Sequence, residues 1–194
     1  AAQARQMHLH MDGARLWEAA AGFERPLRDI AQGFDSVYVS FYKGIGGMAG
    51  AMLLGKQAFI DKAKAWMHRQ GGSIFRRTPY VVAAAMQFDA RLAAMPACMA
   101  RTRQLYVLLQ DYPQWLCNPA TPHCNMLHLH LPIDKEQALS LRNRVAQEHG
   151  IWLFNNAVDT ALPNWCMFEW VVGDQMLALD DTAVRRALDV LAGE

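Results

Sequence analysis

Hydrophobic and polar positions in the first part of the chain switch between the periods of strands and helices. Residues 7–11, Met-His-Leu-His-Met, alternate with a period of two and predict a short strand with both histidines on one face. Residues 14–21 are rich in helix formers and are followed by Gly22, a residue typical of helix ends. Residues 36–42 are β-branched and aromatic and predict a second strand, ending at Lys43. Strands that alternate with helices predict an α/β fold with a mainly parallel sheet.

The same pattern continues to about residue 110. A glycine-rich turn at 44–50 leads into an apolar run at 51–54, which predicts a buried strand. Helices are expected to cover the sheet, at residues 26–32, 56–70, 81–95 and 101–110, with Pro96 as the breaker between the last two.

Two proline-bearing turns, 111–113 and 118–122, predict a domain boundary. A large domain over 1–112 is therefore followed by a small α+β domain over 113–194. The small domain is expected to contain strands at 126–131, 151–154 and 167–172 and helices at 134–148 and 181–191, with Asp180 or Asp181 as an N-cap.

Composition narrows the possible functions. Hydrophobic residues make up 53% and charged residues 19%, which indicates a compact globule. A net charge of +1 argues against a nucleic-acid partner, and no apolar stretch is long enough to span a membrane. The N-terminal residues lack an apolar signal region, and the four cysteines lack C-x-x-C spacing, which favours reduced thiols and a cytoplasmic protein.

Two polar residues mark the ends of the first two predicted strands. Asp12 closes the first and Lys43 the second. Ligands of parallel sheets gather beyond the carboxyl ends of the strands, so one helical crossover would bring this acid and this amine to the same edge. A lysine can form a Schiff base there, and a carboxylate can keep a pyridine nitrogen protonated. These are the two chemical groups that a protein contributes to a pyridoxal phosphate site.

Two motifs carry a family resemblance. The segment 10–15, His-Met-Asp-Gly-Ala-Arg, followed by the segment 40–50, Ser-Phe-Tyr-Lys-Gly-Ile-Gly-Gly-Met-Ala-Gly, resembles the threonine aldolase and aromatic amino acid β-eliminating lyase family. These are pyridoxal phosphate enzymes of the aspartate aminotransferase fold. The resemblance covers the whole chain, as the C-terminal half of the large, cofactor-binding domain (1–112) and the small C-terminal domain (113–194).

The resemblance also implies roles for individual residues. Lys43 would carry the internal aldimine and Asp12 would pair with the pyridine nitrogen. Arg15 would lie beside the ring oxygen, the phosphate or the substrate carboxylate, and Ser40 would reach the phosphate. The absent first half would hold the phosphate-binding loop and the side chain that stacks on the ring. The family further implies a homo-oligomer with active sites at subunit boundaries.

The implied reaction is the cleavage of a β-hydroxy amino acid, such as threonine or allo-threonine, to glycine and an aldehyde. Where threonine aldolases usually carry an arginine for the substrate carboxylate, this sequence has Glu169, which would repel it. Arg76 and Arg77 could supply the missing cation.

Two other functions stay open. The chain could be a catalytically incomplete fragment or a split subunit that needs a complementing N-terminal half. A metal-binding domain is the third possibility, because the pairs His8 with His10 and His128 with His130 each present two imidazoles. The sequence supplies no third ligand at suitable spacing, so no metal is expected. The glycines at 44–50 follow Lys43 instead of preceding it, so they are expected to serve a tight turn and not a P-loop.

Overall fold

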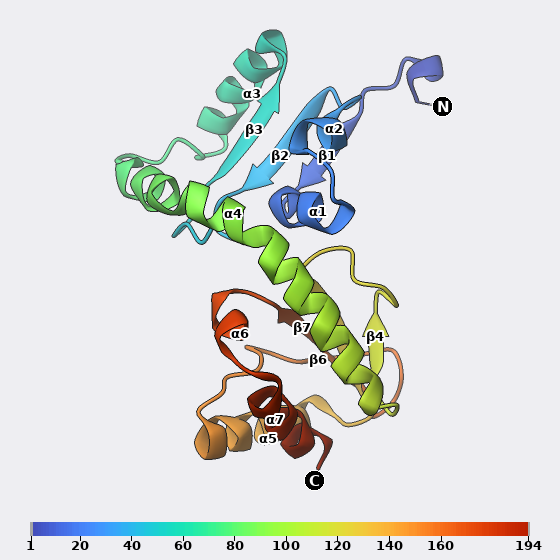
Figure 1. Ribbon diagram of the computed structural model, residues 1–194. Helices are drawn as coiled ribbons and strands as arrows, with labels where there is room; N and C mark the ends of the chain where they lie inside the picture. Colours follow the sequence, from blue (N-terminus) through green and yellow to red (C-terminus); the bar gives the residue numbers. More distant parts are fainter. Residues whose placement is uncertain (1, 194) are drawn as a thin grey trace. The chain divides into compact units, whose positions relative to one another are not determined.

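The computed structural model describes residues 2–193 and divides into two compact units between Met95 and Pro96 (Figure 1). Each unit has its own sheet. The boundary predicted between residues 112 and 113 lies inside the second unit, just after the 3-10 helix Leu109–Asp111. The end residues 1 and 194 of the predicted domains lie outside the described residues.

The first unit is built on a three-stranded sheet, in the order β1 (His10–Gly13), β2 (Ser36–Ser40) and β3 (Ala51–Gly55). β1 and β2 are parallel, whereas β3 returns antiparallel to β2. The helices of this part are α1 (Leu16–Phe23) and α2 (Leu27–Ala31), which connect β1 to β2, and α3 (Gln57–Arg69), with a 3-10 helix, Gln3–Arg5, before β1. The helical crossover between parallel strands confirms the predicted α/β class.

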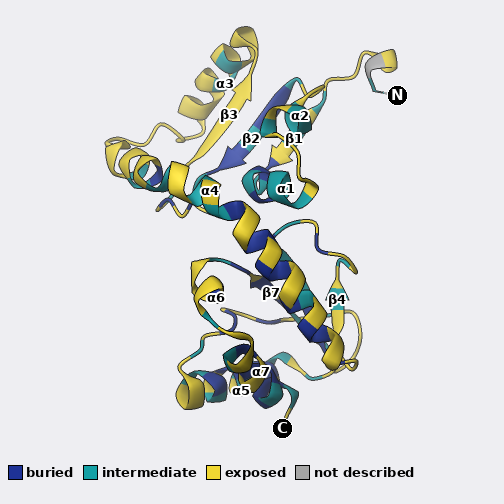
Figure 2. Cartoon of the chain, viewed as in Figure 1, coloured by how far each residue is buried: buried dark blue, intermediate teal, exposed yellow. Residues whose placement is uncertain are grey.

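The two faces of the β1–β2 pair differ in character. Val37 and Val39 alternate with polar residues along β2 and are buried with Leu16 of α1. Met11 of β1 and Ile30 of α2 pack against this cluster. The other face carries polar side chains, which include Asp12 and Tyr38. β3 is exposed along its whole length, although its sequence is apolar (Figure 2).

Helix α4 (Thr78–Leu108) is continuous through Pro96. The prediction of two helices, 81–95 and 101–110, separated at Pro96 is therefore wrong. Pro96 is exposed, while Met95, Cys98 and Met99 beside it are buried. Burial of these neighbours on the other side of the helix offsets the hydrogen bond that proline removes, a local cost of about 3 kcal/mol.

The second unit contains a four-stranded antiparallel sheet in the order β4–β5–β7–β6. Its strands are β4 (Leu116–Asn118), β5 (Met126–Leu131), β6 (Val158–Asp159) and β7 (Cys166–Val171), and its further helices are α5 (Lys135–His149), α6 (Asp174–Ala178) and α7 (Asp181–Ala192). The Asp180 carboxylate accepts a hydrogen bond from the Ala183 N–H at 2.7 Å, which confirms Asp180 as the N-cap of α7.

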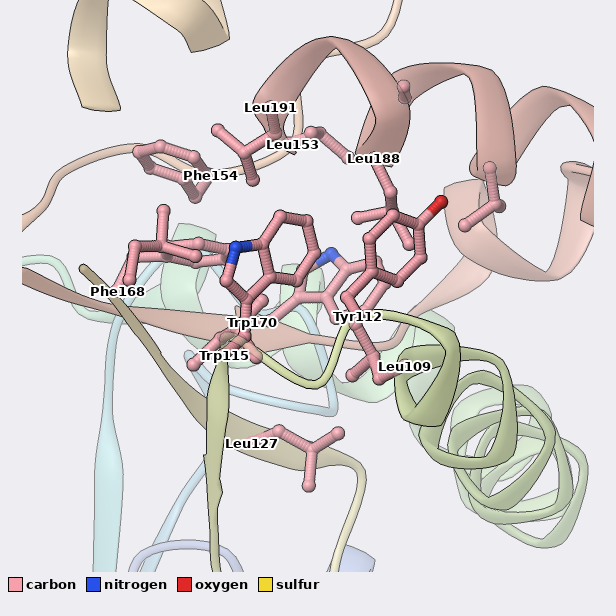
Figure 3. Packing of buried hydrophobic residues seen from close by; sticks show 14 of the residues in the cluster. Leu109, Tyr112, Trp115, Leu127, Leu153, Phe154, Phe168, Trp170, Leu188 and Leu191 are labelled. Carbon is pink, nitrogen blue, oxygen red and sulfur yellow. The ribbon is translucent and has the colours of Figure 1, made fainter. Parts of the chain in front are cut away.

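The strand predicted at 151–154 is wrong, because these residues form no strand. Leu153 and Phe154 are nevertheless buried, and Phe154 stacks on Phe168 at 4.0 Å between ring centres (Figure 3). The Arg142 guanidinium donates hydrogen bonds to the carbonyls of Phe154 and Asn155. Arg142, a side chain of α5, therefore supplies the hydrogen bonds that these two carbonyls would otherwise accept from a neighbouring strand.

Candidate active site

The parallel pairing of β1 with β2 brings the two predicted catalytic segments together. Asp12 is in register with Tyr38, and Lys43 follows the end of β2 by three residues. Both strands end at the same edge of the sheet, where ligands of α/β folds bind. Asp12 lies inside β1 and not beyond a strand at 7–11, so the predicted strand began three residues too early. The Asp12 carboxylate also accepts a hydrogen bond from the Ala14 N–H at 3.1 Å, which fixes the turn into α1.

Two tyrosines connect Asp12 with Lys43. Residues paired across a ladder project to the same face, so Tyr38 shares the face of Asp12. The Tyr38 and Tyr42 hydroxyls are 3.1 Å apart, and the Lys43 ammonium lies 5.9 Å from the centre of the Tyr42 ring. The hydrogen bond to Tyr42 raises the pKa of Tyr38 to about 12, with smaller contributions from desolvation and from the charges of Tyr42 and Asp12. An acid, two phenols and an amine thus follow one another along this edge.

Arg15 occupies the N-cap position of α1, and its side chain is largely buried. Its Nη1 atom lies 3.7 Å from Oε1 of Glu18, one turn later in the helix. The same Glu18 oxygen accepts a hydrogen bond from the Gly44 N–H at 3.1 Å. Desolvation raises the pKa of Glu18, against the opposing effects of backbone hydrogen bonds and of the charges of Arg15 and Lys43.

Ser40 is fully buried at the end of β2. Its hydroxyl donates a hydrogen bond to the Ala14 carbonyl at 2.6 Å, and its own carbonyl accepts one from the Trp17 indole at 2.8 Å. These two bonds join the end of β2 to the beginning of α1. Ser40 thereby stabilises the edge of the sheet on which Lys43 stands, and its contact with a phosphate group stays a prediction.

The glycine-rich segment after Lys43 is a tight turn. The Gly46 N–H donates to the Lys43 carbonyl at 2.9 Å, and the Gly47 N–H donates to the Phe41 carbonyl at 2.7 Å. Gly46 has a φ of 76° and Gly50 a φ of 104°, both in the region that favours glycine. The glycines therefore reverse the chain between β2 and β3, as the sequence predicts.

Comparison with known proteins places this arrangement in a family. The sequence profile of the family described as "Beta-eliminating lyase" matches residues 1–132, the part of the chain that carries both motifs. The chain belongs to the β-eliminating lyase family. This membership confirms the resemblance drawn from the segments 10–15 and 40–50.

Several relatives of this family member carry the name threonine aldolase. Low-specificity L-threonine aldolase 1 of Arabidopsis thaliana is 27% identical over 145 residues, which are 75% of this chain and 40% of that enzyme. A solved structure from Listeria monocytogenes, provisionally named an L-allo-threonine aldolase, is 30% identical with a TM-score of 0.88 and covers 98% of this chain and 53% of its own. One from an Exiguobacterium species, provisionally named an aromatic amino acid β-eliminating lyase/threonine aldolase, is 34% identical with a TM-score of 0.87 over the same shares. The chain thus spans about half the length of these solved relatives.

A cavity of about 530 Å³ opens beside the glycine turn of this β-eliminating lyase family member. Its wall is mostly apolar and includes Phe41, Met52, Tyr80 and Phe88, together with Arg77. The neighbouring Arg76 guanidinium lies 5.3 Å from the ring centre of the exposed Phe75. A role for either arginine in binding a substrate carboxylate stays a prediction.

Glu169 and the histidine pairs have other surroundings. Glu169 lies on β7 of the second unit, with an oxygen 4.0 Å from Nε2 of His128 on β5. His10 shares a hydrogen bond of 2.9 Å with the Ser36 hydroxyl. Across residues 2–193, no three His, Cys, Asp or Glu side chains lie close enough to hold a metal ion. In the same part of the chain, no helix combines the length and apolarity needed to cross a bilayer.

Three side chains at the site escaped the sequence prediction. Tyr38 lies outside both motifs, and Tyr42 stands inside the second motif without an expected role. Strand pairing places Tyr38 beside Asp12, and the two tyrosine hydroxyls are 3.1 Å apart. Glu18 carries no role in the sequence prediction, yet it is buried beside Arg15. The one available signal was its spacing of three residues from Arg15, which places both on one helix face.

Proposed function

We propose that this β-eliminating lyase family member is the lysine-bearing part of a pyridoxal phosphate-dependent lyase. Its reaction is the cleavage of a β-hydroxy amino acid, such as threonine or allo-threonine, to glycine and an aldehyde. The observation that carries the proposal is the common sheet edge of Asp12 and Lys43, bridged by Tyr38 and Tyr42. The relatives named threonine aldolases support the choice of reaction.

The side chains at this edge fit the chemistry of pyridoxal phosphate. Lys43 offers a half-buried amine for the aldehyde group, and Asp12 offers an exposed carboxylate for the pyridine nitrogen. Arg15 adds a guanidinium suited to an oxygen of the cofactor or of the substrate. When bound, the cofactor supplies an electron sink for the bond-breaking step.

Each residue then has a defined task. Lys43 binds the cofactor covalently, and after release its amine holds or moves a proton at the reacting carbon. The negative charge of Asp12 keeps the proton on the ring nitrogen. Arg15 orients the bound molecule through the ring oxygen, the phosphate or the substrate carboxylate. Arg76 or Arg77 of the first unit is the candidate cation for the substrate carboxylate.

We expect the complete enzyme to need a further half of the fold, supplied by a complementing N-terminal part, and to form a homo-oligomer. On β3, Met52, Leu53 and Leu54 are 48%, 37% and 43% exposed, and the solved relatives are about twice as long as this chain. A catalytically incomplete chain is thus the second candidate function. The thiols of its four cysteines favour a reducing, cytoplasmic setting.

Cofactor binding tests the function directly. Titration of the chain with pyridoxal phosphate is expected to produce the near-visible absorption band of a lysine-bound cofactor. Lys43→Ala should abolish the band, whereas Lys62→Ala on the exposed side of α3 should keep it. A band that survives in Lys43→Ala would refute the assignment. Glycine and aldehyde production from allo-threonine then separates a lyase from an inactive binding half.

Complementation tests the partner. The N-terminal part of the Exiguobacterium relative is expected to co-purify with this chain and to confer lyase turnover on it. Leu53→Lys places a charge on β3 and should abolish co-purification, whereas Val158→Lys on the exposed β6 should leave it intact. Equal co-purification of both variants would show that β3 is not the contact surface.

A further inference from the structure

Glu18 is a buried carboxylic acid that the proposed reaction does not use. Its residue is 1% exposed, and its Oε2 atom has no hydrogen-bond partner within residues 2–193. Burial of a carboxyl group with one unsatisfied oxygen destabilises a fold. Stability alone therefore does not explain this residue in the first turn of α1.

The other oxygen of Glu18 joins two elements of the site. Oε1 accepts the hydrogen bond from the Gly44 N–H at 3.1 Å and lies 3.7 Å from Nη1 of Arg15. Gly44 directly follows Lys43, so the hydrogen bond fixes the peptide unit that the lysine carries on its carbonyl side. Lys43 is also close enough for its charge to act on the carboxyl group, because it lowers the pKa of Glu18 against the larger effect of desolvation.

The absence of a side chain at residue 44 follows from the same contact. A Cβ atom there would stand 2.3 Å from Oε1 and 2.7 Å from Cδ of Glu18. Gly44 does not have a positive φ, so its backbone conformation does not require glycine. The space at residue 44 is instead occupied by the Glu18 carboxyl group and by the Met95 Cε atom, which a Cβ would meet at 2.9 Å.

We propose that Glu18 is the positioning residue of this site: its carboxyl group holds the Lys43–Gly44 peptide and Arg15 in one arrangement, so that amine and guanidinium act on the same ligand. The inference rests on the proposed function, in which Lys43 binds the cofactor. Glu18 itself touches neither cofactor nor substrate in this account. Its contribution passes through the Gly44 amide and the Arg15 guanidinium.

Competitive acetylation of the lysines tests the contact without any cofactor. Glu18→Met keeps the volume and the apolar contacts but cannot accept the Gly44 hydrogen bond, whereas Glu18→Gln still can. The acetylation rate of Lys43 relative to Lys62 is expected to rise about three- to tenfold in Glu18→Met, the change that corresponds to one lost hydrogen bond. Glu18→Gln should stay within about twofold of the wild type, because it retains the acceptor. Equal rates in all three proteins would overturn the proposal.

A second variant covers the case in which Glu18→Met does not fold. Gly44→Ala keeps the glutamate at position 18, but the Cβ of the new alanine displaces the Glu18 carboxyl group. It should therefore raise the Lys43 rate in the same direction as Glu18→Met. A Lys43 rate unchanged from the wild type in a folded Gly44→Ala protein would contradict the proposal equally.

Borohydride trapping of pyridoxal phosphate separates this inference from the proposed function. Glu18→Met is expected to trap about tenfold less cofactor on Lys43 than Glu18→Gln at limiting cofactor, with equal trapping on Lys62 in both. If the wild type traps none on Lys43 while the acetylation rates respond as expected, the proposed function fails and the positioning contact stands. If all three proteins trap the cofactor on Lys43 in equal amounts and their Lys43 residues are acetylated at equal rates, the proposed function stands and Glu18 is not a positioning residue.

Discussion

The two units of the chain bury their apolar residues to very different extents. In the second unit, alternate residues of β5 and β7, such as Leu127 and Phe168, are buried in a continuous core with residues of α5 and α7 (Figure 3). In the first unit, the cluster under β2 centres on Leu16, Val37 and Val39, while β3 and most of α3 are exposed (Figure 2). The unit that carries Lys43 leaves the larger number of its apolar side chains exposed, although Leu116 and Trp152 of the second unit are exposed as well. This difference supports a site that is completed by another part of the enzyme.

The largest expected effect is in the second core. Phe168→Ala removes the ring that stacks on Phe154 at 4.0 Å. It should destabilise the second unit by about 3–5 kcal/mol, because the core cannot close around the space left behind. Urea unfolding followed by tryptophan fluorescence measures the loss, and a change below about 1 kcal/mol would disprove a closed, well-packed core.

The same substitution in two strands sharpens the comparison. Leu129→Ala on the buried β5 is expected to cost about 2–5 kcal/mol. Leu53→Ala on the exposed β3 should change the stability of the chain by no more than about 0.5 kcal/mol. Once the complementing half is bound, Leu53→Ala should instead weaken the complex. Similar costs for the two variants in the isolated chain would remove the distinction between the units.

A smaller effect is expected at the N-terminus of α7. Asp180→Ala loses the hydrogen bond from the Ala183 N–H and should destabilise the second unit by about 1 kcal/mol. Asp180→Asn is the matched control, since asparagine caps equally well and should be close to neutral. The urea midpoints of both variants test the cap, and an equal loss in both would assign the effect to charge instead.

The pH dependence of the first unit gives the smallest expected effect. Burial raises the pKa of Glu18 above its ordinary value of 4.5. As the pH rises past that value, the unfolded chain releases this proton before the folded chain does, so the folded state loses stability until both have released it. Glu18→Gln has no such proton, and the stability of the wild type relative to this variant should fall as the pH rises above about 4.5. A difference that is constant with pH would show that Glu18 titrates normally.

The sequence predicted what local patterns determine. Period-two runs and β-branched residues located β2 and β5. The double motif indicated Asp12, Arg15 and Lys43 as site residues, and their roles stay predictions. The helix break predicted at Pro96 is wrong because burial on one side of the helix outweighs the effect of a proline on the other side. The strand predicted at 151–154 is wrong because Arg142, on a separate helix, donates hydrogen bonds to the carbonyls of Phe154 and Asn155. Tyr38, Tyr42 and Glu18 depend on strand register and on a helix-to-turn contact, which no single-sequence pattern records.

Identification of the lysine that binds pyridoxal phosphate is the most direct test of the role proposed for Lys43. The chain has five lysines, so borohydride reduction in the presence of pyridoxal phosphate, followed by peptide mass mapping, distinguishes them. The pyridoxyl group is expected on Lys43, and Asp12→Ala is expected to reduce its yield, while Asp61→Ala on the exposed α3 should not. Labelling spread evenly over the surface lysines, with Lys43 no more modified than Lys62, would contradict it.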